Sequence, residues 1–165
     1  NLNEEQLPAN QTFIAALKGL PLHYEIPTHP LNRAGNVTAP IVGGNLSMLY
    51  SLLGSPSDLN TDGKILFIED VDEYLYHIDR MMTNFERNGK LEHLAGLLVG
   101  QFSDMHDNTI PYGQTAEEII AEHCRRYSFP VFFNFPAGHV VNNLAIKMGC
   151  EMTCCAKDNA LEFTI

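Results

Sequence analysis

Residues 64–70 read Lys-Ile-Leu-Phe-Ile-Glu-Asp, an apolar run that ends abruptly in two carboxylates. The stretch from Ile65 to Ile68 does not alternate between apolar and polar side chains, which is typical of a strand that is buried on both faces and central in its sheet. The preceding Asn-Thr-Asp-Gly, at 60–63, is a turn signal. Because successive side chains of a strand point to opposite faces, only one of Glu69 and Asp70 can face a given site.

Helical and extended patterns alternate on both sides of this strand. The clearest helix follows it directly: we expect Asp70 or Asp72 to cap this helix and Asn88-Gly89 to end it. Its buried stripe is expected to be Leu75, Ile78, Met81, Met82 and Phe85. Further helices are expected at 4–20, at 45–53 with Asn45 as the N-cap, and at 115–126. Further strands are expected at 24–27, 94–102, 131–135, 145–153 and 161–165.

Two segments near the start of the chain complete the expected fold. In the first helix, Phe13, Ile14 and Leu17 form the apolar stripe, and residues 28–40 are rich in Pro, Gly and Asn and should be loop or edge structure. The alternation of helices and strands, followed by a tail rich in strands, indicates an α/β fold. We therefore expect one domain over residues 1–165, with a mixed sheet or partial barrel and flanking helices.

Composition narrows the class of protein. The 165 residues are 45% hydrophobic and 18% charged, enough for one domain with a sizeable core. Twenty acidic residues against ten basic ones give a net charge of −10, which argues against nucleic acid or an anionic membrane as a partner. No apolar run is long enough to cross a bilayer and no signal peptide is visible. The chain opens at Asn1 without Met, so we expect a processed or excised piece of a longer protein.

The cysteines do not indicate a metal site. They stand at 124, 150, 154 and 155, without the paired C-x-x-C spacing that zinc sites use, and the sequence has no H-E-x-x-H pattern. Cys154 and Cys155 are adjacent in an expected strand and would point to opposite faces. We expect reduced thiols that act as small core side chains, and neither a metal nor a cofactor.

A second apolar run, Phe132-Phe133-Asn134-Phe135, leads through Pro136-Ala137-Gly138 to His139. Two rigid strands that each end in an ionisable residue could bring a carboxylate and a histidine together on loops, as catalytic sites often do. Glu69 would then hold His139 in one tautomer while His139 acts as a base. Simpler interpretations remain: Glu69 as a helix cap or surface ion pair, His139 as a loop histidine bonded to backbone, and Asp70 in the place of Glu69.

A nucleophile to complete such a site is not visible. The sequence has no G-x-S-x-G elbow, and Ser47 falls in the first turn of an expected helix, where a small polar residue has a structural use. The serines at 51, 55, 57, 103 and 128 have no supporting context, and Cys124 lies within an expected helix. The residues taken alone therefore describe half of an active site.

Five blocks occur in an order that resembles one known family. They are Gly43-Gly44-Asn45-Leu46-Ser47, the 64–70 segment, Tyr76-His77-Ile78-Asp79-Arg80-Met81, the 94–102 segment, and Pro136-Ala137-Gly138-His139. Together they resemble the C-terminal domain of the LD-carboxypeptidases, serine peptidases that include muramoyltetrapeptide carboxypeptidase and the microcin C immunity protein. The resemblance runs from about Leu20 to Thr153.

The resemblance implies a swivelling β/β/α domain that supplies Glu69 and His139 to a Ser-His-Glu triad. The serine and the oxyanion hole would lie on an N-terminal domain outside this chain, so the chain alone should be inactive. The implied reaction releases D-Ala from a murein tetrapeptide during peptidoglycan recycling. The family also implies a cytoplasmic homodimer without cofactors. As a fragment, the chain should in addition expose an apolar face where the other domain would sit.

Other functions stay open on the sequence. The immunity branch of the family implies hydrolysis of a peptidyl or aminoacyl nucleotide instead. A binding module that kept the fold and lost the chemistry is a second alternative. A metal-dependent hydrolase would need a cluster of metal-ligating residues that the sequence does not offer.

Overall fold

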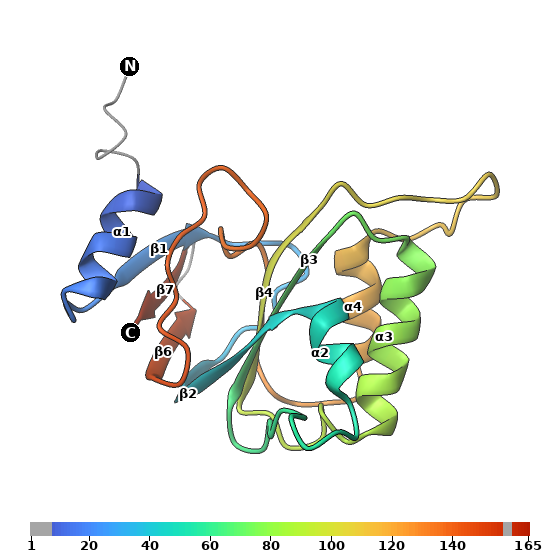
Figure 1. The fold of residues 1–165 in the computed structure, drawn as a ribbon, viewed down its shortest axis with the longest axis horizontal. Helices are drawn as coiled ribbons and strands as arrows, with labels where there is room; N and C mark the ends of the chain where they lie inside the picture. The colour runs from blue at the N-terminus through green and yellow to red at the C-terminus, as the bar shows by residue number, and fades with distance from the viewer. Residues whose placement is uncertain (1–7, 157–159) are drawn as a thin grey trace.

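The computed structural model of the chain describes residues 8–156 and 160–165. Its helices are α1 (Pro8–Leu17), α2 (Leu46–Leu52), α3 (Leu75–Arg87) and α4 (Ala116–Cys124). Its strands are β1 (His23–Pro27), β2 (Asn36–Asn45), β3 (Ile65–Val71), β4 (Gly96–Ser103), β5 (Val131–Phe132), β6 (Glu151–Ala156) and β7 (Ala160–Thr164). These elements make a mixed α/β fold, as the sequence predicted (Figure 1).

Strand β2 joins two halves of one sheet whose order is β1-β7-β6-β2-β3-β4-β5. Residues 36–40 of β2 pair antiparallel with β6, and residues 41–45 pair parallel with β3. On one side of β2 the strands continue antiparallel through β6, β7 and β1, and on the other side they continue parallel through β3, β4 and β5. Residues 36–40, expected as loop or edge structure, are therefore part of an interior strand.

The sheet curls so that its two halves face each other. The rings of Phe132 in β5 and Phe163 in β7 lie 5.7 Å apart, and those of Tyr24 in β1 and Phe135 lie 5.3 Å apart. In a flat sheet, β5 and β7 would be separated by five strand spacings, or roughly 24 Å. The predicted mixed sheet or partial barrel is confirmed as a strongly curled mixed sheet that keeps its two edges, β1 and β5.

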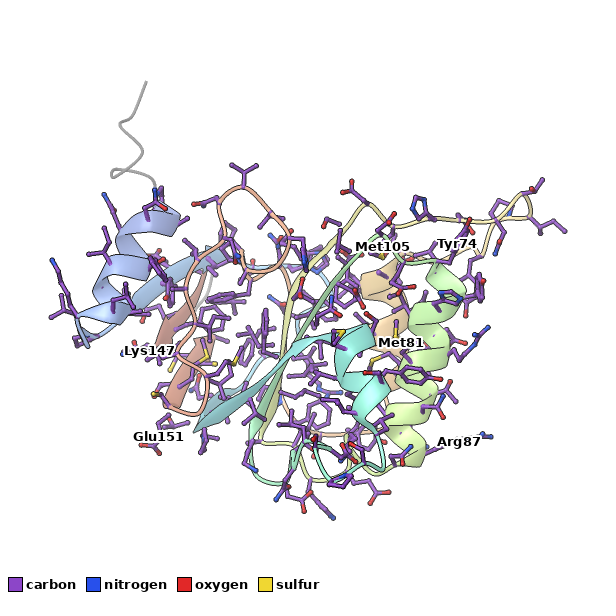
Figure 2. The ribbon with its side chains drawn as sticks, in the orientation of Figure 1. Tyr74, Met81, Arg87, Met105, Lys147 and Glu151 are labelled. Carbon is purple, nitrogen blue, oxygen red and sulfur yellow. The ribbon has the colours of Figure 1, made fainter. Side chains whose placement is uncertain are left out.

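Strand β3 carries core residues on both faces, as its sequence predicted. Leu66 and Ile68 pack with α2, α3 and α4 on one side, while Ile65 and Phe67 pack with the antiparallel half on the other. Figure 1 shows the three helices together on one side of the parallel strands, with β1, β6, β7 and α1 on the other. In Figure 2, Met81 of α3 lies among the side chains between this helix and the sheet, whereas Arg87 at its end projects outward. The buried stripe predicted for α3 is confirmed.

The start of α3 differs from the prediction. The N-cap is Tyr74, which makes no side-chain capping bond, so neither Asp70 nor Asp72 caps this helix. Strand β3 continues through Val71, which places both Glu69 and Asp70 inside the strand. Asp72 then turns the chain with a φ of 61° and bonds to His106 on the neighbouring loop. Contacts with other segments, rather than the local sequence, thus decide which hydrogen-bond partners these carboxylates have.

Other predicted elements shift at their ends. Helix α2 has Asn45 as its N-cap, and α4 begins with a capping box at Thr115 and Glu118. Strand β5 stops at Phe132, and Asn134 takes a left-handed conformation with a φ of 68°. The strand expected at 145–153 begins only at Glu151. For the helix expected at 4–20, residues 4–7 lie outside the described part of the chain.

The apolar stripe predicted for α1 points away from the core. Phe13 and Leu17 are 57% and 73% exposed, and Ile14 is also exposed. The side that meets the antiparallel half of the sheet is made by the small residues Ala15 and Ala16. Periodicity located the apolar face of this helix correctly, but that face has no cover among the described residues.

Three further observations bear on the expected partners and ligands. Cys124 and Cys154 are buried free thiols, as predicted, whereas Cys150 is exposed and does not belong to the core. Across residues 8–156 and 160–165, His, Cys, Asp and Glu side chains form no group of three or more that could hold a metal ion. Within the same residues, no helix has the length and apolar character needed to cross a membrane.

Candidate active site

Glu69 and His139 meet in the structure although 70 positions separate them in the sequence. The Nδ1 atom of His139 lies 2.8 Å from Oε2 of Glu69. Because a carboxylate accepts hydrogen bonds, Nδ1 carries the proton and donates a hydrogen bond to Glu69. The contact expected from the sequence is therefore present.

The segment that carries His139 is tied to β4 along its length. The amide of Phe135 donates to the carbonyl of Val99 at 3.1 Å, and the amide of Gln101 donates to the carbonyl of Ala137 at 3.0 Å. The side-chain amide of Gln101 also donates to Oδ1 of Asn134 at 3.0 Å. The residues after β5 therefore continue along β4 as an irregular extension of the sheet and deliver His139 beside the end of β3.

Gly138 lets this segment pass directly over Glu69. Its φ is +133°, and a Cβ at this position would lie 2.8 Å from Oε2 of Glu69. A larger residue would meet both a disfavoured backbone conformation and a steric clash. Two further bonds hold the turn: Gly138 N–H donates to Oδ1 of Asn143 at 3.1 Å, and the Ser103 hydroxyl donates to the carbonyl of His139 at 3.2 Å.

The two members of the pair differ in their access to solvent. The Glu69 side chain is 8% exposed, whereas that of His139 is 54% exposed. Glu69 is thus enclosed by the protein and its bond fixes the orientation of the imidazole. Since Nδ1 donates to Glu69, Nε2 has the free lone pair of this tautomer and can accept a proton from another group.

An open pocket of about 530 Å³ lies beside the pair. Glu69, Phe67 and Gly138 line it together with Phe13 of α1. Residues of the loop after His139 also line it, among them Val141, which is 96% exposed. The site therefore lies at a surface that is partly apolar and open.

Asp70 faces the other side of the sheet and does not compete for His139. Its Oδ1 accepts from Asn45 Nδ2 at 2.7 Å, and its Oδ2 accepts from the amide of Ser47 at 2.9 Å. The two adjacent carboxylates therefore serve two separate networks, as strand geometry requires. Of the two carboxylates considered from the sequence, Glu69 is the one that contacts the histidine.

Three other histidines also contact carboxylates, which the sequence analysis did not anticipate. His77 Nδ1 lies 2.8 Å from Glu73 one helical turn away, and His123 Nε2 lies 2.9 Å from Asp79 on the neighbouring helix. His106 contacts Asp72 between two loops. The i, i+4 spacing could have revealed the first pair, whereas the other two depend on the fold. A histidine–carboxylate contact alone is therefore common in this chain and does not define a catalytic site.

Ser47 and Ser103, which bond to the site or to its neighbour Asp70, serve structural roles. The Ser47 hydroxyl donates to Asn45 Oδ1 at 2.7 Å in the first turn of α2, as expected for a structural residue. The Ser103 hydroxyl bonds to the main chain of His139 and not to its ring. Neither serine is arranged as a nucleophile for His139.

Residues 38–154 match the LD-carboxypeptidase C-terminal domain family. The chain belongs to this family. Both proposed site residues and the five sequence blocks lie within the matched region. The fold class inferred from the resemblance agrees with the observed structure.

The chain has relatives named as carboxypeptidases and one named for microcin immunity. The chain is 36% identical over 117 residues to the "Probable murein peptide carboxypeptidase" of Bacillus subtilis, covering 71% of this chain and 37% of that protein. It is 26% identical over 148 residues to the murein tetrapeptide carboxypeptidase of Pseudomonas aeruginosa, covering 88% and 47%. It is 27% identical over 125 residues to the microcin C7 self-immunity protein MccF of Escherichia coli, covering 72% and 34%. The chain thus spans less than half the length of each of these relatives.

Solved structures agree on the fold. The muramoyltetrapeptide carboxypeptidase of Oxalobacter formigenes superimposes with a TM-score of 0.85 at 24% identity, covering all of this chain and 56% of that one. MccF superimposes with a TM-score of 0.71 at 20% identity, covering 81% of this chain and 40% of that one. Both similarities are structural and establish the shared architecture.

Proposed function

We propose that this chain is the part of a serine carboxypeptidase that bears the histidine and the glutamate of a Ser-His-Glu triad. The substrate would be a murein tetrapeptide, and the reaction would hydrolyse its terminal L-D peptide bond and release D-Ala. The observation that carries the proposal is the 2.8 Å contact between His139 Nδ1 and the enclosed Glu69 carboxylate, with the imidazole half exposed beside an open pocket.

The geometry suits a base that works on a group outside the described residues. A serine hydroxyl would attack the carbonyl carbon of the terminal peptide bond while His139 Nε2 takes its proton. Glu69 would hold the ring in the required tautomer and stabilise the charged imidazolium. His139 would then return the proton to the leaving amine of D-Ala. In the second half of the reaction, water would give a proton to His139 and attack the acyl carbon, and the serine oxygen would leave and take the proton back from His139.

The nucleophile and the oxyanion donors would come from a preceding N-terminal domain. The surface around the pocket supports this arrangement because exposed apolar residues gather there on two separate segments. Phe13 of α1 and Val141 and Met148 of the later loop line the pocket and are exposed. Apolar patches of this kind are typical of surfaces that another protein segment covers. We further propose that the protein acts in the cytoplasm as a homodimer, without a metal or a cofactor.

Two other activities would use the same site differently. A relative named for microcin immunity shares the domain, so hydrolysis of a peptidyl nucleotide is one alternative outcome. A binding module without catalysis is the other. The 36% identity to a relative named for murein peptides favours the murein substrate as the first one to test.

The test compares the 165-residue chain with the longer protein, in which the proposed nucleophile domain precedes it. Release of D-Ala from murein tetrapeptide is measured by chromatography. We expect activity in the longer protein, none in the chain alone, and loss of activity in His139→Ala. His77→Ala is the matched control, because His77 Nδ1 also lies 2.8 Å from a glutamate. Equal activity in the wild type and His139→Ala would refute the catalytic role, and turnover of a peptidyl nucleotide alone would favour the immunity-type reaction.

A further inference from the structure

Asp70 is an enclosed carboxylate that the proposed reaction does not use. It is 1% exposed, and only two other polar or charged residues in the described chain, Thr61 and Glu69, are buried. Three donors surround it: Asn45 Nδ2 at 2.7 Å, the Ser47 amide at 2.9 Å and the Val71 amide at 2.9 Å. Burying a carboxylate costs free energy unless hydrogen-bond donors satisfy it, so these three donors are needed to keep Asp70 inside the protein.

The network joins the end of β3 to the start of α2 through one strand pairing. Asn45 lies opposite Glu69 in the parallel register of β2 and β3. Its side chain accepts from the Ser47 hydroxyl at 2.7 Å and from the Met48 amide at 3.1 Å, while its amide group donates to Asp70. The Asn45 oxygen is therefore held by the first turn of α2, and Asp70 is bound to a partner that α2 keeps in place.

Glu69 lies at a point where the pairing of β3 with β4 is irregular. Ile68 pairs with Val99 and Asp70 pairs with Phe102, so β4 has one residue more than β3 across this step, as in a β-bulge on β4. Bulges aim individual side chains, and a slip of one residue would turn a side chain to the opposite face of the sheet. A slip at this point would swap the positions of Glu69 and Asp70 and remove the carboxylate from His139.

We propose that Asp70 is a positioning residue: its bonds to Asn45 and Ser47 lock the end of β3, beside the bulge in β4, so that Glu69 faces His139. Asp70 contacts neither the imidazole nor the pocket beside it. Its effect on turnover rests on the proposed function, whereas its effect on the Glu69–His139 contact does not. The two effects are therefore measured separately.

The first measurement is NMR of the histidine ring nitrogens in the 165-residue chain. His139→Gln identifies the His139 signals by their loss. We expect Asp70→Asn to shift or abolish the Nδ1–H signal of His139. The new side chain has an NH₂ group in place of one carboxylate oxygen, so this group would face an N–H donor and could not accept its hydrogen bond. Thr61→Val is the matched control: it removes a buried polar bond, from Thr61 Oγ1 to the Lys90 carbonyl at 2.8 Å, and should leave the His139 signals unchanged.

Rescue separates positioning from a general loss of stability. In the double variant Asn45→Asp with Asp70→Asn, the amide and carboxylate exchange places, so we expect the His139 signals to return at least in part. If Asp70→Asn does not fold, as judged by circular dichroism, Asn45→Ala replaces it as the milder change. Unchanged His139 signals in a folded Asp70→Asn chain would overturn the proposal, whatever the enzyme assay shows.

The second measurement is steady-state kinetics in the longer protein. A misplaced Glu69 should lower kcat by about 10- to 100-fold and leave KM nearly unchanged, because no substrate-facing group has been removed. Shifted His139 signals without any turnover in the wild type would refute the proposed function and retain the positioning role. A KM effect without a kcat effect would contradict the positioning role in catalysis.

Discussion

Gly138 lies so close to Glu69 that a Cβ at position 138 would be 2.8 Å from Oε2 and 3.2 Å from Cβ of the glutamate. The residue before the histidine thus determines whether the histidine can reach its partner. The Pro-Ala-Gly-His sequence at 136–139 serves this approach, with a backbone conformation that glycine adopts readily at a φ of +133°.

Gly138→Ala should therefore destabilise the domain and separate His139 from Glu69. Backbone strain and the clash together should lower the free energy of unfolding by about 1–3 kcal/mol, as measured by urea denaturation. Gly44→Ala is the control, since Gly44 has a φ of +152° but open space around its Cβ position. Equal losses in the two variants would mean that the clash with Glu69 contributes nothing.

Glu69→Gln should affect turnover far more than folding. The amide has nearly the same shape as the carboxylate, but it neither stabilises the imidazolium nor fixes the tautomer as well. We expect kcat in the longer protein to fall by about 10²- to 10⁴-fold, by analogy with the carboxylate of serine-protease triads. Glu73→Gln alters the equivalent contact with His77 and should leave kcat unchanged. A similar fall in both variants would contradict a special role for Glu69.

The four cysteines should differ sharply in reactivity. Burial raises the pKa of the Cys124 thiol and that of the Cys154 thiol to about 12, so both stay protonated near neutral pH. Cys150 is exposed and should react first with a chromogenic disulfide reagent, and Cys150→Ser should abolish that fast phase. Cys124 and Cys154 should react only after denaturant is added. Rapid labelling of Cys124 in the native protein would show that the helical side of the sheet opens readily.

The ion pair between Asp58 and Lys90 should give the protein a pH-dependent contribution to stability. The ammonium lies 2.8 Å from the carboxylate, and its hydrogen bond is the main cause that lowers the pKa of Asp58 in the folded state. A lowered folded-state pKa stabilises the fold above the unfolded-state value and loses this effect as the pH falls through the folded-state value. Asp58→Asn should therefore destabilise the chain at neutral pH.

The difference between Asp58→Asn and the wild type should shrink as the pH falls through the lowered folded-state pKa of Asp58, and vanish once both side chains are uncharged. Urea denaturation at several pH values measures it, and Asp62→Asn, at an exposed position four residues away, is the control. A difference that persists unchanged into acid would assign the effect to shape rather than charge.

The sequence predicted features that depend on local pattern and missed those set by distant contacts. The continuous apolar run at 65–68 correctly predicted a strand with two buried faces, and Asn45 was correctly predicted as the cap of α2. Asp70 was wrongly expected to cap the next helix, because the competing donors on Asn45 and Ser47 come from another part of the chain. Local spacing cannot show which of several nearby donors the fold will bring closest.

The same limit applies to α1 and to the candidate site. Periodicity showed that Phe13, Ile14 and Leu17 share a face, but it could not show whether that face is covered. Spacing alone could not bring Glu69 and His139 together, and the order of the family blocks was the stronger indication. The contacts of His106 and His123 with aspartates needed the fold, because each joins two elements that are distant in the sequence.

Strand β2 has a mechanical consequence for the site. One uninterrupted backbone pairs with β6 over its first half and ends at Asn45, which bonds to Asp70. The antiparallel half and the carboxylates at the end of β3 therefore share a single strand. Docking of another domain against the antiparallel half would act on the same strand that contacts Asp70, so the site and the docking surface should respond to each other.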